Sequence, residues 1–255
     1  MREITRRAGT VYTALVPNVR GAERAIEART DELNLVMSAS ETHNISNLRM
    51  TREQSFASLA QVVATAQAAQ VAVNVSLSCV FGCPMEGNVH ASAVFDWVQR
   101  FADLGVRGIT LCDTTGMAYP TQVHQLTTAA RARWPGMDFT LHFHNTRGMG
   151  LANVLAAIDA GADRFDASLG GLGGCPYAPG ASGNVVTEDL VFMFEAMGVA
   201  TGVDLPKLLA AREALRLPAL IGHDIPSQIV KAGQRLTLHP VPADFEAIRE
   251  RALAR

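Results

Sequence analysis

The stretch "TLHFHN" at residues 140–145 places two histidines, His142 and His144, two positions apart inside an apolar run. If this run is a β-strand, side chains alternate between the faces of the sheet, and both imidazoles project to the same side. Two neutral imidazoles on one strand face can bind one metal ion. A buried, hydrogen-bonded pair and two solvated histidines on an edge strand are alternatives that the motif alone leaves open.

Short β-rich runs of the same kind recur along the chain and alternate with amphipathic helical stretches. The expected strands cover residues 12–17, 32–37, 72–78, 108–113, 139–144 and 164–169. Most are nearly continuous apolar runs, as in a parallel sheet that is covered by helices. The alternation of strands and helices therefore predicts an α/β fold with a parallel sheet.

The positions of the polar residues favour a TIM barrel over a doubly wound sheet, and both are α/β architectures that fit the alternation of strands and helices. Asp113, His142 and His144 lie at or just after the carboxyl ends of expected strands, which is typical of TIM barrels. No Gly-x-Gly-x-x-Gly motif follows the first strand, which counts against a doubly wound nucleotide-binding sheet. A TIM barrel has eight strand–helix units, whereas this sequence supplies about six, so we expect a (β/α)8-type barrel that is incomplete in this chain.

Helix ends are marked by local signals. Thr51 and Gln54 have the spacing of a capping box before an expected helix over residues 51–70. Gly105 is expected to follow the end of a helix over residues 92–105. Thr187 is expected to be the N-cap of a helix over 187–198, with acidic residues in its first turn.

Composition indicates one large globular domain over residues 1–255. Charged residues make up 18% and apolar residues 48% of the 255 residues, which excludes a disordered chain. A net charge of −2 gives no reason to expect nucleic acid or a charged membrane as a partner. No long apolar run predicts a spanning helix and the first residues do not resemble a secretory signal, so the cytoplasm is the expected location.

A glycine-rich segment surrounds a single cysteine, Cys175. The segment "SLGGLGGCPYAPGASGN" at 168–184 contains six glycines and leads directly into the helix expected from Thr187. A flexible linker is one interpretation, and a phosphate-binding loop is another, although no lysine follows in the Walker position. We favour a mobile lid that brings a thiol onto a substrate, because thiols serve as acid–base groups or nucleophiles.

This segment resembles the cysteine loop of the 3-hydroxy-3-methylglutaryl-CoA (HMG-CoA) lyases. The similarity covers nearly the whole chain; its motifs are "LVPN" (15–18), "SASETHN" (38–44), "VSLSCVFGCPMEG" (75–87), "CDTTGMAYP" (112–120), "HFHNTRGMGLAN" (142–153) and "GGLGGCPYAPGASGNVVTEDL" (170–190). The resemblance implies a metal-dependent TIM-barrel lyase that cleaves a carbon–carbon bond beside an acyl-CoA thioester. The implied reaction gives acetoacetate and acetyl-CoA, as in leucine degradation and ketone-body formation.

The resemblance also implies a role for six residues. His142, His144 and Asn184 would be ligands of one divalent ion, Mg²⁺ or Mn²⁺, since the ligands are nitrogen and oxygen atoms. Cys175 would be a lid thiol that shuttles a proton. Asp113 would be a substrate-side acid, and Glu188 a supporting acid. The implied partner is a small acyl-CoA molecule, and the oligomeric state, including a homo-oligomer, is left open.

One element of the family pattern is missing from the sequence. The family begins with a strand that ends in Arg-Asp-Gly, where the Asp is a metal ligand, and this tripeptide occurs nowhere in residues 1–255. Aligned with the family, the first expected strand corresponds to the third barrel strand, so we expect the domain to be truncated at its amino terminus. Loss of one such electrostatic group typically costs on the order of 10²–10³ in rate. We therefore expect residues 1–255 alone to bind metal poorly and to show little lyase activity.

Two alternatives to the HMG-CoA lyase interpretation remain. The same fold could serve a related aldolase or a Claisen-type synthase that acts on another acyl-CoA or a 2-oxo acid, although the cysteine loop argues against it. The chain could also be a non-catalytic product, or a subunit that is completed by a partner, which the missing Arg-Asp pair favours.

Overall fold

The computed structural model describes residues 1–255 except 2, 175–179, 181–182, 223, 235–237 and 255. Its six strands are β1 (Thr13–Leu15), β2 (Glu32–Ser38), β3 (Ala72–Ser78), β4 (Gly108–Asp113), β5 (Asp138–Phe143) and β6 (Arg164–Asp166). All neighbours pair in parallel in the order β1-β2-β3-β4-β5-β6, which is the order of the sequence. Successive right-handed βα units with this strand order build the wall of a TIM barrel, so the predicted fold class is confirmed.

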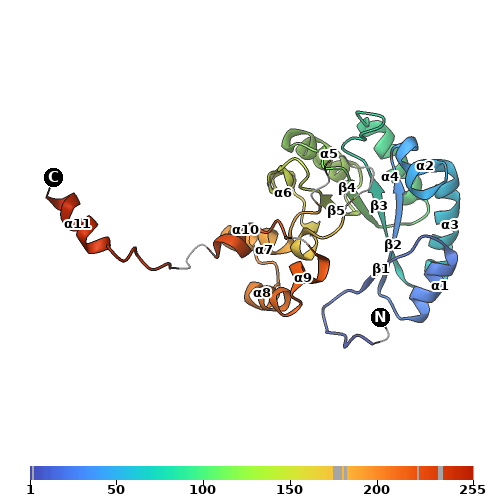
Figure 1. Cartoon of the computed structure of the whole chain (residues 1–255). Coiled ribbons are helices and arrows are strands. Elements are labelled where there is room, and N and C mark those ends of the chain that lie inside the picture. The colour runs from blue at the N-terminus through green and yellow to red at the C-terminus, as the bar shows by residue number, and fades with distance from the viewer. Residues whose placement is uncertain (2, 175–179, 181–182, 223, 235–237, 255) are drawn as a thin grey trace.

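Helices cover the outer face of the curled sheet (Figure 1). The first six helices are α1 (Val19–Glu27), α2 (Glu41–Leu48), α3 (Arg52–Ala68), α4 (Ala91–Asp103), α5 (Pro120–Arg133) and α6 (Gly150–Asp159). A 3-10 turn, η1 (Leu169–Gly171), follows β6 and is succeeded by α7 (Thr187–Ala196), α8 (Leu205–Ala214), α9 (Leu217–Ile221), α10 (Gln228–Ala232) and α11 (Phe245–Leu253). Among the described strands, β1 and β6 each have one neighbour, so this sheet is open.

The sheet has one apolar and one polar face. In β5 the residues at alternate positions, Phe139, Leu141 and Phe143, are buried, whereas Thr140 and His142 between them are partly exposed. The same alternation runs through β2. Because strand side chains alternate with a period of two, one face packs against the helices and the other lines the concave side of the sheet.

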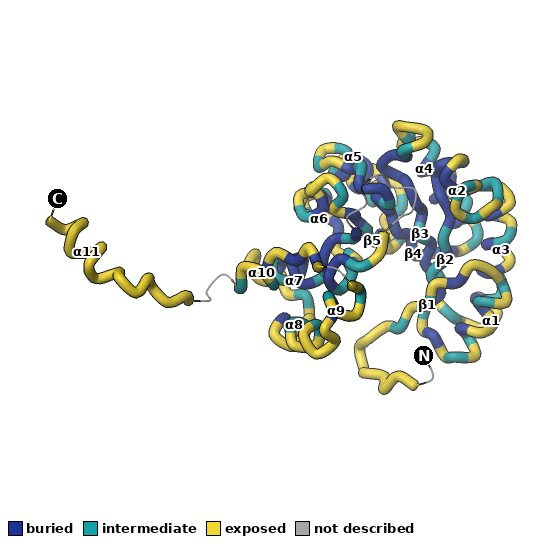
Figure 2. The backbone as a smooth tube through the Cα atoms, in the orientation of Figure 1, coloured by how far each residue is buried: buried dark blue, intermediate teal, exposed yellow. Residues whose placement is uncertain are grey.

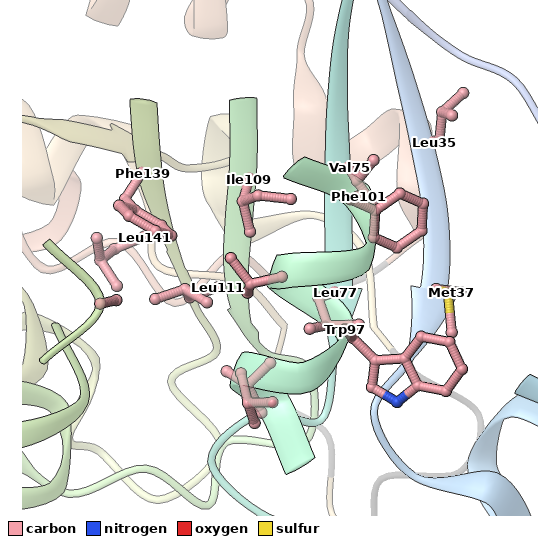
Figure 3. Packing of buried hydrophobic residues seen from close by; sticks show 14 of the residues in the cluster. Leu35, Met37, Val75, Leu77, Trp97, Phe101, Ile109, Leu111, Phe139 and Leu141 are labelled. Atoms are coloured by element: carbon pink, nitrogen blue, oxygen red, sulfur yellow. The ribbon is translucent and has the colours of Figure 1, made fainter. Parts of the chain in front are cut away.

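The apolar face forms the main core. Figure 3 shows buried side chains of β2–β5 in one layer, with Trp97 and Phe101 of α4 beside those of β2 and β3. Phe101 is fully buried and Trp97 is 6% exposed, and each such side chain contributes roughly 1.5–3 kcal/mol by leaving water. This packing holds the strands rigidly, and hence the residues at their carboxyl ends.

The two last helices of the chain differ in how they contact the rest of the structure. Figure 2 shows an exposed arm leading to α11, which has no buried residue. By contrast, Asp189 of α7 accepts hydrogen bonds from the Ser227 hydroxyl at 2.9 Å and from the Gln228 and Ile229 amides at the start of α10. This buried carboxylate therefore fixes α10 to the barrel, while α11 lies apart from it.

No helix of the described residues is both long and apolar enough to cross a bilayer.

The predicted helix signals agree with the structure in two cases and fail in one. The Thr51–Gln54 capping box is present at the start of α3, and Gly105, with φ +83°, follows the C-cap of α4. Thr187, however, is the first residue of α7 and the N-cap is Val186. The physical reason is tertiary, since the Thr187 amide donates to the Ser168 carbonyl at 2.9 Å and so extends the helix boundary toward η1.

Three predicted strands end earlier than expected, and β5 does so by one residue, at Phe143. β1 stops at Leu15, because Pro17 has no amide hydrogen with which to continue the ladder. β6 stops at Asp166 instead of residue 169, because the chain then pairs with the segment before α7, where Ser168 bridges Val186.

The α3 capping box provides a test of local stability. Thr51→Ala removes the side-chain oxygen that accepts from the Gln54 amide at 3.2 Å, and we expect it to lower the free energy of unfolding by about 1 kcal/mol. Urea denaturation measures the change. The control is Gln61→Ala on the exposed side of the same helix, which should shift stability by less than about 0.5 kcal/mol. Equal effects of the two variants would contradict the capping role.

Candidate active site

The carboxyl ends of β4, β5 and β6 bring the predicted residues to one edge of the sheet. The parallel register sets Cys112 beside His142, and His142 beside Asp166. All three positions belong to the concave face. His144 lies two residues beyond His142, just after β5 ends.

The two histidine rings share one space. Their centroids lie 5.1 Å apart with an angle of 65° between the ring planes, as expected for positions i and i+2 of one strand. The His144 residue is 6% exposed, and its Nδ1 has no hydrogen-bond partner among the described residues. His142 is more open, and its Nδ1 lies 2.6 Å from Asp166 Oδ1.

The neighbours of the rings shift their pKa values in opposite directions. Burial together with the positive charge of His142 lowers the pKa of His144 to about 4. Burial acts against protonation of His142 too, but the hydrogen bond and charge of Asp166 outweigh it and raise the pKa of His142. His144 is therefore neutral near pH 7 and carries a free lone pair, which is the form that binds metal.

Asn184 reaches the same place through a returning segment of chain. Residue 184 forms an antiparallel bridge with His144, the Asn145 amide donates to the Gly183 carbonyl at 3.0 Å, and the Val185 amide donates to the Phe143 carbonyl at 3.0 Å. Its side-chain Nδ2 donates to the Leu172 carbonyl at 2.6 Å. Asn184 Oδ1 is buried and has no partner within the described part of the chain.

Glycine at 183 is needed for this return. Its φ of +98° lies in the left-handed region, and a Cβ there would collide with the Gly171 carbonyl oxygen. Only glycine adopts this conformation without strain. The local sequence therefore sets Asn184 against the end of β5.

Asp113 lies at the end of β4 but on the helix-facing register, opposite Phe143. Its Oδ1 accepts hydrogen bonds from the Met117 amide at 2.7 Å and the Ala118 amide at 3.1 Å, while Oδ2 is buried and has no partner among the described residues. Burial raises the pKa of Asp113 to about 6, against the opposing effect of the two amides. Asp113 thus shapes the turn after β4 and titrates close to neutral pH, but its register differs from that of the two histidines.

Glu188 is fully buried in the first turn of α7. Its carboxylate accepts the Gly170 amide at 2.9 Å, and Arg212 Nε lies 3.7 Å away. Gly170 is part of η1, at the start of the glycine-rich segment. The contacts of Glu188 therefore hold η1, at the start of that segment, in place.

Cys175 lies outside the described residues, so its predicted role stays a prediction. Asp166 is a site residue that the sequence reasoning did not single out. The sequence could have identified it through the alignment of two neighbouring expected strands. Parallel pairing of the strand at 139–144 with the strand at 164–169 puts Asp166 opposite His142.

The residues present fit a divalent cation. Two buried polar atoms without a partner, His144 Nδ1 and Asn184 Oδ1, occur on residues that bridge each other, beside a second imidazole. Leaving such atoms unpaired is costly unless something binds them. Among the described residues, no three His, Cys, Asp or Glu side chains are grouped so that they could hold a metal ion.

The fold and this site define a class of protein that sequence comparison identifies. A family model described as HMGL-like matches residues 1–215. The chain belongs to this family.

Individual members of the family show how similar the chain is to known proteins. It is 45% identical over 225 residues to a hydroxymethylglutaryl-CoA lyase, YngG, of Bacillus subtilis, covering 88% of this chain and 75% of the relative. It is 42% identical to an (R)-citramalyl-CoA lyase of Chloroflexus aurantiacus, covering 87% of this chain and 69% of the relative. A solved HMG-CoA lyase of Acinetobacter baumannii in complex with coenzyme A and 3-methylmalate superposes with a TM-score of 0.88 at 51% identity, covering 94% of this chain and 78% of that one.

The low pKa of His144 predicts a pH-dependent stability. The folded chain holds the pKa of His144 at about 4 against an ordinary value of 6.5, so its contribution is present above pH 6.5 and is lost as the pH falls toward 4. We expect wild type to lose on the order of 3 kcal/mol more than His144→Gln over this range. Urea unfolding with a chelator present at each pH measures the difference. Gln61→Ala on the exposed side of α3 removes no titratable group and should keep the wild-type slope. Parallel curves for wild type and His144→Gln would contradict the assignment.

The contacts of Glu188 predict a large stability loss on truncation. Glu188→Ala leaves the Gly170 amide and Arg212 without their buried partner, and we expect a loss of about 3 kcal/mol. Glu188→Gln retains an acceptor for the Gly170 amide and should lose less. Glu213→Ala, which is exposed on α8, is the control. A denaturation midpoint of Glu188→Ala close to that of Glu213→Ala would show that the buried carboxylate does not anchor η1.

Proposed function

We propose that this protein is a carbon–carbon lyase that cleaves HMG-CoA to acetoacetate and acetyl-CoA. The observation that carries the proposal is the convergence of His142, His144 and Asn184 at the end of β5, with buried nitrogen and oxygen atoms left unpaired. Membership of the HMGL-like family, with relatives named HMG-CoA lyase at 38–45% identity, supports it. Acetoacetate is a ketone body, so the reaction fits leucine degradation or ketone-body formation.

The reaction requires one proton to leave the tertiary hydroxyl of the substrate and another to be added to the enolate carbon of acetyl-CoA. Deprotonation of the tertiary hydroxyl lets the adjacent carbon–carbon bond break, and the electron pair of that bond forms the enolate of acetyl-CoA. Protonation of the enolate carbon then completes the second product. The protein must therefore offer a site for the hydroxyl, a proton acceptor and a proton donor.

The three proposed ligands prepare the first of these sites. A divalent ion, Mg²⁺ or Mn²⁺, would polarise the hydroxyl and carboxylate oxygens of the substrate when bound. His144 is held neutral by burial, so its lone pair is available near pH 7. The side chain of Asn184 is held by the hydrogen bond from its Nδ2 to the Leu172 carbonyl. Its Oδ1 takes no part in that hydrogen bond and is the atom that would bind the ion.

Proton transfer is assigned to the remaining candidates. Asp113, with a pKa near 6 and an unpaired Oδ2 within the described chain, is proposed as the substrate-side acid. Glu188 supports the site by holding Gly170. We propose Cys175 as the thiol that delivers the proton to the enolate, since it follows directly on the segment that Glu188 and Asn184 hold.

A second candidate activity is cleavage of citramalyl-CoA to pyruvate and acetyl-CoA. The 42% identical relative carries that name. Both thioesters have a tertiary hydroxyl β to the thioester carbonyl and differ by one methylene before the carboxylate, so the same ligands serve both. The choice depends on the distance from the cation to the group that binds the carboxylate.

The test is to incubate each thioester with protein and Mn²⁺ and to quantify acetoacetate and pyruvate separately. Residues 1–255 are compared with a version extended at the amino terminus by a strand that ends in Arg-Asp-Gly. We expect acetoacetate from HMG-CoA with the extended version and little turnover by residues 1–255. Fast turnover by residues 1–255 would show that the expected need for Arg-Asp is wrong. Neither product from either version would contradict the lyase proposal.

A ligand substitution tests the site within the same assay. His144→Ala removes one proposed ligand, and we expect kcat of the extended version to fall by at least about 10²-fold. His124→Ala on α5, where Nε2 lies 3.2 Å from Asp159, is the matched surface control and should retain the wild-type rate. A His144→Ala enzyme as active as the control would remove His144 from the site.

A further inference from the structure

Asp166 stands apart from the other acidic residues near the barrel mouth because its described ion-pair partner is a proposed ligand. Parallel pairing sets it opposite His142, and Asp166 Oδ1 lies 2.6 Å from His142 Nδ1. At this distance the contact is a short, charge-assisted hydrogen bond. Since a carboxylate only accepts, Nδ1 must carry the proton.

The direction of this hydrogen bond fixes the other ring nitrogen. In a neutral imidazole, a proton on Nδ1 leaves the lone pair on Nε2. The contact also restrains rotation of the ring, because Asp166 is fixed on β6 by the backbone ladder. His144 has no such partner in the described residues and is restrained by burial instead. The ring of His142 is therefore oriented by a hydrogen bond, whereas the ring of His144 is oriented by the packing around it.

We propose that Asp166 is a positioning residue that holds His142 as the Nδ1–H tautomer and directs Nε2 toward the cation site. The inference rests on the proposed function, because it takes His142 as a ligand. A carboxylate behind a metal-binding histidine makes the imidazole a stronger donor and fixes its orientation. Asp166 acts through His142 and has no direct contact with the reacting atoms in this role.

A neighbouring carboxylate provides the comparison. Asp138 at the start of β5 lines the same 320 Å³ hollow on the concave face as Asp166. Its ion-pair partner is Arg164, at 3.2 Å, at the amino end of the strands. Asp138 thus supplies similar charge without touching His142, and Asp138→Ala separates loss of charge from loss of the hydrogen bond.

The first experiment reads the tautomer directly, without metal and without turnover. Long-range ¹H–¹⁵N spectra of the chelator-treated chain, at a pH at which both imidazoles are neutral, report which nitrogen of His142 is protonated. We expect Nδ1–H in wild type and in Asp138→Ala, and a shift toward Nε2–H in Asp166→Ala. An Nε2–H signal in wild type, or an unchanged tautomer in Asp166→Ala, would overturn the proposal.

The second experiment measures by titration the Mn²⁺ affinity of the version extended by the Arg-Asp-Gly strand. We expect Asp166→Ala to weaken binding about 10- to 100-fold and Asp138→Ala to leave it near wild type. If Asp166 acts through the ring, the double variant His142→Ala/Asp166→Ala binds no more weakly than His142→Ala alone. A further loss equal to that of the single Asp166 variant would mean that Asp166 contacts the ion itself, which overturns the positioning role.

The two experiments separate failure of this inference from failure of the proposed function. If the wild-type version extended by the Arg-Asp-Gly strand takes up no Mn²⁺, the cation site and the ligand role of His142 are contradicted. The tautomer result decides independently whether Asp166 controls the ring.

Discussion

The parallel pairing of β4, β5 and β6 is the constraint on which the candidate site depends. One register aligns Cys112, His142 and Asp166 across three strands, and the strand period of two turns His142 and His144 to the same side. A shift of one residue would send both imidazoles into the helix-covered core and bring Phe143 to the concave face. The apolar layer formed by Phe139, Leu141 and Phe143 opposes such a shift, so the core that stabilises the fold also fixes the chemistry.

The same strands divide stability and chemistry between two faces. The buried residues of β2–β5 pack against α4 and its neighbours, while the concave face carries polar side chains such as Asn34, Asn74 and Thr110, which are linked at 2.8 Å. Buried polar atoms on that face are paired with each other in the middle of the sheet, whereas His144 Nδ1 and Asn184 Oδ1 at the carboxyl end have no partner among the described residues. Glu188 and Asn184 extend this order to the glycine-rich segment, because they hold Gly170 and Leu172 near its start.

Much of this arrangement could be predicted from particular residues. The runs at 72–78 and 108–113 coincide with β3 and β4, and the His-x-His spacing gave the shared face, because both depend only on local periodicity. The boundary at Thr187 failed because a tertiary hydrogen bond to Ser168 overrides the local cap signal. Asp166 escaped notice because its role depends on the register between two strands. The place of Asp113 at the end of a strand could be predicted from the sequence, whereas its register opposite Phe143 is seen only in the structure, and its role stays a prediction.

We propose that His142, His144 and Asn184 bind one cation together. Pulsed electron paramagnetic resonance of Mn²⁺ bound to the protein measures it most directly, because coordinated imidazole nitrogens couple to the electron spin. We expect coupling to two histidine nitrogens, with one lost in His142→Ala and the other in His144→Ala. Bound Mn²⁺ without nitrogen coupling, or coupling that persists when both histidines are replaced, would contradict it.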